Sequence, residues 1–274
     1  MILMIDIHNH VIYKFDDGPK TIEESLEMLR IAADQGITDV FATSHFSEII
    51  PREVESDYFD KLKILQEETA TKNILVNIHS GSELFYHLFM DQTIKEKKVA
   101  SLAGKGLYVL MEFSLFIMPT GVEETLYKLS MNGIIPIIAH PERYPAVVQN
   151  PQHALDYLKY GAIYQMNAGS VLGRFGKEVQ KLSMWMLENK LVHFISSDAH
   201  TVKNRTFRLK EAVESLQPHL DADYISELVE KNARKILNSE RIEKVKVPDL
   251  QPQDGLFARL KKKLGLSSKN YLIS

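Results

Sequence analysis

The strongest constraint on the fold is an alternation of short apolar runs with longer amphipathic stretches along most of the 274-residue chain. The apolar runs are rich in Ile and Val, which is typical of strands buried on both faces of a parallel sheet. The pattern predicts strands at residues 4–7, 39–43, 75–78, 107–113, 134–139, 162–166 and 193–196. It predicts helices at residues 21–35, 58–71, 122–131, 153–160, 177–189, 207–216 and 223–237.

Seven strand–helix units in one run favour parallel strands joined by crossover helices. We therefore predict one α/β domain over residues 1–240. A barrel of about seven strands is the first choice, and a doubly wound open sheet is the alternative.

The tail at residues 241–274 has a different composition. It contains Pro248, Pro252 and Gly255, followed by a basic stretch at residues 256–264. Two interpretations stay open for this stretch. It forms a short basic amphipathic helix that makes weak contact with an anionic membrane surface, or it is a solvated tail.

Composition excludes several classes of protein. The chain has no cysteine, so disulfides, thiolate metal sites and a cysteine nucleophile are excluded. A net charge of -3 gives no electrostatic reason to expect nucleic acid as a partner. No apolar run reaches the roughly 18 residues that a membrane span needs, and the N-terminus turns polar too early for a signal peptide. A cytoplasmic protein is the expectation.

Residue types that bind metal ions follow six of the seven predicted strands. In parallel α/β folds the carboxyl ends of the strands converge on the active site. Any one of these residues alone would be an ordinary packed or solvated side chain, but their shared position predicts a metal site. The candidate ligands are His8, His10, Asp17, His45, Glu83, Glu112, His140, Asp198 and His200.

The charges of these candidates support the same prediction. The carboxylates of Asp17, Glu83, Glu112 and Asp198 would repel one another in one pocket, and some would have to bind protons. Three divalent cations would bring six positive charges against four negative ones and leave a centre suited to an anion. Nitrogen and oxygen ligands without sulfur suit Mn, Fe, Zn or Co. Such a centre can activate water and hold phosphoryl oxygens, which predicts hydrolysis of a phosphate ester.

The order of these motifs resembles the polymerase-and-histidinol-phosphatase superfamily. Residues 6–10 (DIHNH), 16–19 (DDGP), 139–144 (AHPERY) and 197–200 (SDAH) look most like the bacterial CpsB/YwqE-type tyrosine phosphatases of capsule and exopolysaccharide biosynthesis. The resemblance covers about residues 4–238. It implies a distorted (β/α)7 barrel with three metal ions, usually Mn²⁺.

The resemblance also implies how the ligands divide among the ions. One metal would be held by His8, His10, Glu83 and Asp198, a second by Glu83, Glu112 and His140, and a third by Asp17, His45 and His200. Arg143 and Arg205 match the family's phosphate-binding arginines. The implied activity is dephosphorylation of phosphotyrosine in a protein substrate, namely a bacterial tyrosine kinase, with arginine stabilising the phosphate.

Alternatives stay open for four of the polar residues. Arg143 binds phosphate or forms a surface ion pair with Glu142. Arg205, like Arg208, binds phosphate or is a solvated residue at the start of a helix. Asp16 is either the turn residue beside Asp17 or a catalytic group, and the turn is favoured.

Two other functions also fit the sequence. The chain could be another phosphoesterase of the superfamily, such as a histidinol phosphatase, because the ligands act on the phosphate that these substrates share. It could also be a barrel that keeps its metals without catalysis.

Overall fold

The computed structural model describes residues 3–243 of the chain. Within this range, seven parallel strands form one sheet in the order β1 to β7, so each strand pairs with the next one along the chain. The strands are β1 (Met4–Asn9), β2 (Ile37–Phe46), β3 (Asn77–Phe85), β4 (Tyr108–Glu112), β5 (Ile135–Ala139), β6 (Ile163–Asn167) and β7 (Phe194–Ser196).

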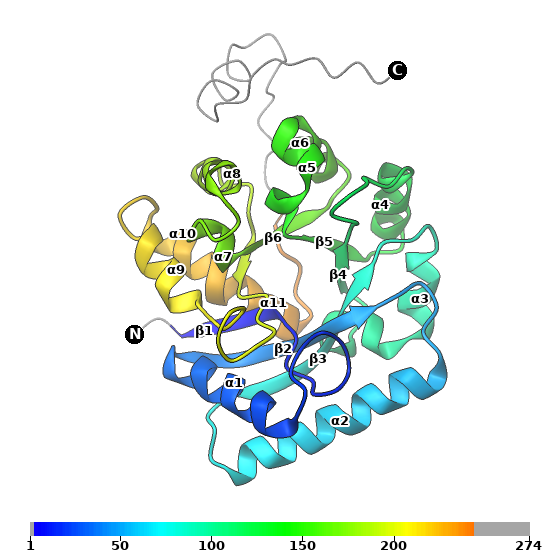
Figure 1. Cartoon of the computed structure of the whole chain (residues 1–274). Coiled ribbons are helices and arrows are strands. Elements are labelled where there is room, and N and C mark those ends of the chain that lie inside the picture. The colour runs from blue at the N-terminus through cyan, green and yellow to red at the C-terminus, as the bar shows by residue number, and fades with distance from the viewer. Residues whose placement is uncertain (1–2, 244–274) are drawn as a thin grey trace.

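The helices form a ring outside the strands (Figure 1). The longer ones are α1 (Ile22–Asp34), α2 (Arg52–Thr71), α4 (Val122–Met131), α6 (Gln152–Lys159), α8 (Lys177–Glu188) and α9 (Leu209–Leu216). Shorter ones are α3 (Met90–Glu96), α5 (Pro145–Gln149), α7 (Ala168–Val171), α10 (Ala222–Ser226) and α11 (Asn232–Asn238). Thr21 caps α1 by accepting a hydrogen bond from the Glu24 amide.

The sheet closes into a barrel where β7 meets β1. Asn9 and Ala199 form a parallel bridge. The Asp198 amide donates to the His8 carbonyl at 2.8 Å, and the His10 amide donates to the Ala199 carbonyl at 2.8 Å. The seam therefore lies at the carboxyl ends of the two strands, and the predicted barrel is confirmed in place of the open sheet.

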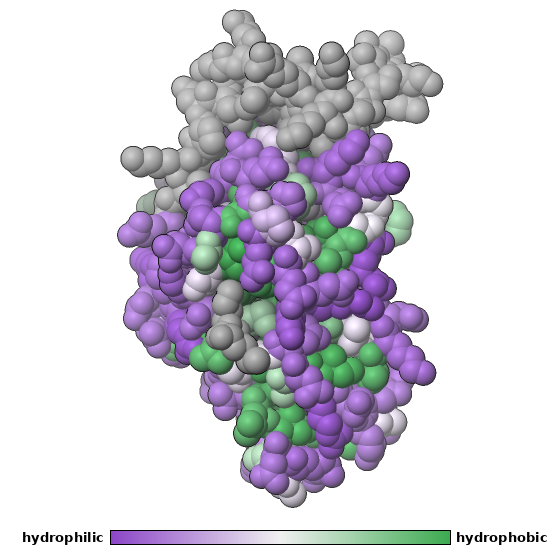
Figure 2. Space-filling view, turned by 90° about the vertical axis from the view of Figure 1, so that its left-hand side faces the viewer, coloured by the Kyte–Doolittle hydropathy of each residue, from purple (hydrophilic) through white to green (hydrophobic). Residues whose placement is uncertain are grey.

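Alternation along the strands divides the core into two layers. Residues such as Phe41, Leu110 and Ile137 fill the barrel interior, and Ala233 and Ile236 of α11 pack against the same cluster. Residues of the opposite strand faces pack under the surrounding helices. Seen from the side that carries α9 and α10, the surface is mostly hydrophilic, with apolar residues in separate groups (Figure 2).

Some predicted element bounds were wrong. The predicted strand at residues 75–78 begins at Asn77 and continues to Phe85, so Glu83 lies inside β3 instead of after it. The predicted helix at residues 58–71 begins six residues earlier, at Arg52. The expected basic helix at residues 256–264 lies outside the described residues, and the domain boundary at residue 240 stays a prediction. None of the helices within residues 3–243 is long and apolar enough to span a membrane.

Candidate metal centre

The candidate ligands continue the rows of side chains that fill the barrel interior. On β2, β4 and β7, Phe41, Leu110 and Phe194 face the interior. Residues an even number of positions further on lie on the same face of a strand. His45 and Glu112 occupy such positions on β2 and β4, and they meet Asp198, which lies two residues beyond the end of β7, at the carboxyl end of the barrel.

The first strand reaches the centre through an irregularity. Ile5 and Ile7 belong to the interior cluster, so regular alternation would turn His8 away from it. The pairing of β1 with β2 shifts register between Asp6 and Asn9. Such irregularities re-aim side chains, and here both His8 and His10 point toward Glu83.

Glu83 lies in the middle of the cluster and is almost fully buried. Its Oε2 atom is 3.2 Å from His8 Nε2, 3.4 Å from His10 Nε2 and 3.1 Å from His45 Nδ1. Its Oε1 atom is 3.1 Å from His140 Nε2. One carboxylate therefore touches four imidazole rings that come from three different strands or strand ends.

Asp198 and Glu112 flank Glu83 on two sides. Asp198 Oδ1 lies 3.6 Å from His8 Nε2 and 3.7 Å from His10 Nε2. Glu112 lies 3.5 Å from His45 Nδ1 through Oε2 and 3.8 Å from His140 Nε2 through Oε1.

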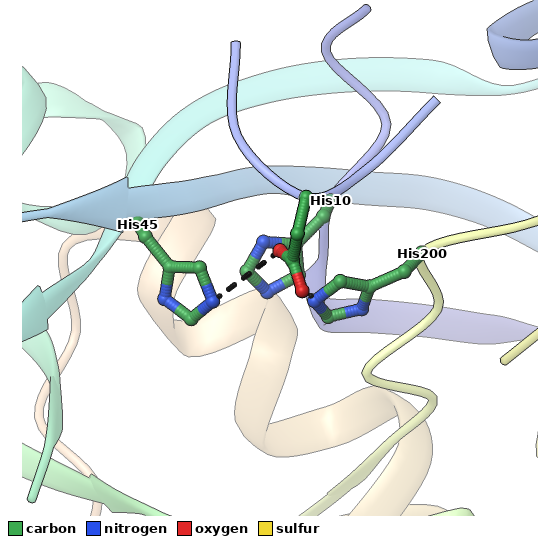
Figure 3. Close-up of side chains that lie close together, drawn as sticks. His10, His45 and His200 are labelled. Atoms are coloured by element: carbon green, nitrogen blue, oxygen red, sulfur yellow. Dashed lines mark ion pairs between the residues drawn. The ribbon is translucent and has the colours of Figure 1, made fainter. Parts of the chain in front are cut away.

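The third part of the centre lies at its mouth, where His10, His45 and His200 surround a carboxylate (Figure 3). Asp17 Oδ1 is 3.2 Å from His200 Nε2 and 3.5 Å from His45 Nε2. Asp17 and His45 are the most exposed of the candidate ligands, with 58% and 40% of their side chains accessible. The deep groups are thus closed to solvent, while this rim is open to a substrate.

Four overlapping groups of donor atoms are close enough to share an ion. They are His8 with Glu83 and His140; His8 with His10 and Asp198; His45 with Glu83 and Glu112; and Asp17 with His10, His45 and His200. All nine residues predicted from the sequence come together. The grouping differs from the expectation, because His8, His10 and His45 each belong to two groups instead of one, and Glu112 and His140 belong to different groups. His45 does so through its two ring nitrogens.

The histidine rings test whether this cluster fits metal ions. His8 Nδ1 donates to Gln165 Oε1 at 2.8 Å, and His10 Nδ1 donates to Asp16 Oδ2 at 2.8 Å. His200 Nδ1 donates to the Asp198 carbonyl at 3.0 Å. A proton on Nδ1 leaves the lone pair on Nε2, and in all three rings Nε2 is buried without a hydrogen-bond partner.

This arrangement is the one expected of metal-binding histidines, whose second nitrogen is held by an acceptor. Two ligands about 2.1 Å from one ion are at most ~4.2 Å apart. The nitrogen–oxygen separations of 3.1–3.8 Å around Glu83, Glu112 and Asp198 meet that limit. The residues present therefore fit bound divalent cations.

The electrostatics of the cluster lead to the same conclusion. Burial disfavours the charged ring of His8, but Glu83 and Asp198 outweigh burial and raise its pKa to about 9. Burial and His10 lower the pKa of His200 to about 3. Although burial opposes it, the charge of His8 holds the pKa of both Glu83 and Asp198 below the usual range. The site thus attracts positive charge, which protons or metal ions can supply.

Both predicted arginines reach the cluster. Arg143 Nη1 lies 3.1 Å from Asp198 Oδ2. Arg205 Nη2 lies 3.0 Å from Asp198 Oδ1, and its Nη1 lies 3.4 Å from Asp17 Oδ2. Arg208 instead pairs with Glu211 at 2.8 Å.

The alternative pairing of Arg143 with Glu142 at the surface is wrong. Glu142 is completely buried. It accepts hydrogen bonds from the Asn167 amide at 3.0 Å and the Ser170 hydroxyl at 2.6 Å. Burial raises the pKa of Glu142. This residue therefore fixes the loop that carries Arg143 without neutralising the guanidinium.

Two candidate ligands adopt unusual backbone conformations. His140 has a φ of 34° and Asp198 a φ of 52°, both in the left-handed region that non-glycine residues seldom adopt. Such strain is typical of functional sites, where the surrounding structure holds it in place. His140 directly follows β5, and Asp198 lies two residues after the end of β7.

Sequence reasoning missed the residues that hold the ligands. Asp16 was expected to be a turn residue, and it does accept from the Gly18 amide at 2.9 Å. It also holds His10 and accepts from the His45 amide at 3.0 Å. Gln165 and Asn167 were not predicted; the available signal was two polar residues on the inward face of an otherwise apolar strand. Asn167 donates to Asp198 at 2.8 Å.

Replacing Asp16 with Asn is expected to weaken metal binding by 10- to 100-fold, the usual effect of losing such a supporting group. The amide oxygen can still accept from the His10 ring, but it carries no charge. Metal affinity is measured by competition with a chromogenic chelator, and Asp57→Asn on the exposed face of α2 is the matched control. Equal affinity in both variants would contradict a positioning role for Asp16.

The chain matches the family described as "Capsular polysaccharide synthesis, CpsB/CapC" over residues 4–238. It is 37% identical over 247 residues to the "Putative tyrosine-protein phosphatase CapC" of Staphylococcus aureus, covering 88% of this chain and 94% of that one. It is 32% identical over 239 residues to the "Tyrosine-protein phosphatase YwqE" of Bacillus subtilis (strain 168), covering 87% and 93%.

Solved structures agree with these matches. One from a study titled "Crystal structures of YwqE from Bacillus subtilis and CpsB from Streptococcus pneumoniae, unique metal-dependent tyrosine phosphatases" superposes with a TM-score of 0.83 at 31% identity. It covers 90% of this chain and 100% of that one. A phosphotriesterase homology protein from Escherichia coli, at 11% identity and a TM-score of 0.58, shares the fold. The family match, spanning nearly the whole barrel, shows that this chain belongs to the CpsB/CapC family.

Proposed function

We propose that this protein is a metal-dependent tyrosine phosphatase that removes phosphate from phosphotyrosine in a protein substrate. The observation that carries the proposal is the set of three buried imidazoles whose unpartnered Nε2 atoms lie beside carboxylates. His8 and His10 face Glu83 and Asp198, and His200 faces Asp17. The names of the relatives supply the substrate class. The same centre carries two guanidinium groups on its open side.

We infer that three divalent cations occupy the centre, divided as the family resemblance implies, and that Mn²⁺ is the metal used. Glu83 would bridge two of the ions, because its two oxygens face different histidines. When bound, the ions supply Lewis-acid charge and lower the pKa of the water that attacks phosphorus.

The arginines bind and orient the phosphate. A guanidinium makes two parallel hydrogen bonds to phosphoryl oxygens and keeps its charge at any pH of interest. Arg143 is held in place by Asp198 and by the ring of Phe175, which lies 4.4 Å below its guanidinium carbon. Arg205 contacts both Asp198 and Asp17.

The leaving group of this reaction needs little help from a general acid. The phenol of tyrosine has a pKa of about 10, so its phenolate leaves more easily than an alkoxide. Strong proton donation is unnecessary at this step. The open rim formed by Asp17 and His45 lets a tyrosine side chain approach the deeper groups.

The physiological substrate that we propose is a tyrosine kinase of capsule biosynthesis, in line with the family description. A cytoplasmic location and weak membrane contact through residues 256–264 stay predictions from the sequence.

Hydrolysis of a phosphotyrosine peptide, before and after dialysis against EDTA, tests the function. We expect activity that is lost on chelation and returns with Mn²⁺. Activity that survives complete removal of metal would contradict the proposal. Faster turnover of histidinol phosphate than of the peptide would favour the small-molecule alternative. Absence of turnover on any phosphate ester by the metal-loaded protein would favour a barrel without catalysis.

Replacing Arg143 with Ala is expected to lower kcat about 100- to 1,000-fold, as for the loss of one donor that stabilises transition-state charge. Metal content should stay unchanged, because the guanidinium contacts a ligand without being one. Both quantities are measured on the same preparation, with Arg30→Ala on α1 as the control. Loss of metal in Arg143→Ala would mean that the residue supports the centre instead.

A further inference from the structure

A cavity of about 200 Å³ opens beside the metal centre. The turn at residues 172–176 forms one wall through Arg174 and Phe175, and the segment at residues 204–208 forms the other through Arg205 and Arg208. Ser197 and Asp198 also line it. Asp198 and Arg205 belong to the metal centre and also line this cavity. The cavity therefore adjoins the position where the phosphate is bound.

The residues that line this cavity carry a net positive charge. They bring three guanidinium groups and one carboxylate, that of Asp198. Arg205 pairs with Asp198, and Arg208 pairs with Glu211. Arg174 donates to the Asn204 carbonyl at 3.0 Å and has no acidic partner within residues 3–243. A site with an uncompensated guanidinium favours an anion.

The wall at residues 172–176 is built to present these side chains. Gly173 and Gly176 have φ values of 73° and 97°. Glycine adopts such positive values readily, whereas a residue with a Cβ would be strained there. Gly169 lies beneath the turn, and a Cβ there would be 3.0 Å from the Phe175 ring. Phe175 in turn supports Arg143, so one turn positions both the cavity wall and a phosphate-binding arginine.

The opposite wall has unused hydrogen-bonding groups. The Oγ1 atom of Thr206 and the Nε atom of Arg208 are buried without a partner in the described structure. Buried polar atoms are nearly always paired. Thr206 and Arg208 line the cavity together with Arg174, so an oxyanion bound in it would lie beside hydroxyl and guanidinium donors.

We propose that this cavity is a second anion subsite, which binds the carboxylate or phosphate of a residue close to the phosphotyrosine in the substrate chain. The proposal rests on the proposed function, since it concerns the substrate of the same centre. An extended chain advances about 3.3–3.6 Å per residue, so a residue one or two positions from the phosphotyrosine can reach a cavity that shares Asp198 with the centre. The protein would therefore prefer acidic or multiply phosphorylated tyrosine segments.

The test uses three phosphotyrosine peptides that differ at the neighbouring positions, which carry alanine, glutamate or a second phosphotyrosine. With the metal-loaded full chain, kcat/KM is expected to be about tenfold higher for an anionic peptide than for the alanine peptide. Arg174→Gln should abolish this ratio and leave hydrolysis of p-nitrophenyl phosphate unchanged, while Arg174→Lys should restore part of it. Arg234→Gln, which changes an exposed arginine paired with Glu230, is the matched control.

The two anionic peptides separate the sources of the charge. A preference for either one or for both supports the subsite and identifies the group that it binds. Equal kcat/KM for all three peptides, or the same ratio in Arg174→Gln as in the natural chain, would overturn it.

Binding gives a readout that does not depend on turnover. The same three sequences with a non-hydrolysable phosphonate in place of the scissile phosphate should show the same tenfold ratio in Kd, and Arg174→Gln should remove it. If no phosphotyrosine peptide is hydrolysed, the proposed function fails, and the Kd ratio alone then decides whether the subsite exists.

Discussion

Replacing Glu83 with Gln is expected to lower kcat by about a thousandfold or more and to deplete the protein of metal. Glu83 contacts His8, His10, His45 and His140 through its two oxygens, so no other side chain in the cluster touches as many candidate ligands. The amide keeps the size of the side chain but loses its charge and one acceptor. Lewis-acid stabilisation of this kind contributes several kcal/mol, and each 1.36 kcal/mol is a factor of ten in rate.

Metal content by mass spectrometry and turnover of a phosphotyrosine peptide are measured together for this variant. Glu53→Gln, at an exposed position in the first turn of α2, is the control and should behave like the natural chain. A Glu83→Gln protein that retains full metal content and more than a tenth of the activity would show that Glu83 is not a bridging ligand.

Removal of the metal ions is expected to lower the melting temperature by roughly 10 °C. Ligands present at about 1,000 times their Kd stabilise the native state by about 4 kcal/mol, and 1 kcal/mol shifts the melting temperature of a domain of this size by about 2–4 °C. The physical source is the repulsion among Asp17, Glu83, Glu112 and Asp198, which the ions neutralise. Calorimetry with and without EDTA measures the shift.

Two controls separate this shift from other effects of the chelator. Glu83→Gln, already depleted of metal, should show a much smaller change on addition of EDTA. Adding back Mn²⁺ in excess should return the natural chain to its original midpoint. An unchanged midpoint in the natural chain after complete removal of metal would contradict a deep cluster.

The ligands were predictable because the fold and the chemistry coincide at the strand ends. A histidine or carboxylate after a buried apolar run is noticeable in the sequence, and parallel strands bring such positions to one mouth. The prediction needed no exact strand bounds. Glu83 lies two residues inside β3, yet its side chain still faces the mouth.

The supporting groups were harder to predict because their roles depend on three-dimensional neighbours. Nothing in the sequence pairs Gln165 with His8, since 157 positions separate them. Glu142 and Arg143 are adjacent in sequence, and charge alone suggested an ion pair. The structure separates them because Glu142 turns into the core toward Ser170 while Arg143 turns toward Asp198.

Short elements were missed for a related reason. Helix α3 has seven residues, or about two turns, and its only buried residues are Met90 and Ile94, so its amphipathic pattern is a single pair of apolar positions. Helices this short are stabilised by tertiary packing and carry little signal of their own.

The place where the barrel closes gives the metal ions a second effect. His8 and His10 belong to the first strand and Asp198 follows the last, and the main-chain bonds that join these strands lie among the same residues. An ion held by all three would cross-link the two edges of the sheet and complete its circumference at one point. Without that cross-link, the edges are the part of the barrel that can separate at least cost, so local opening would begin there well before the whole chain unfolds.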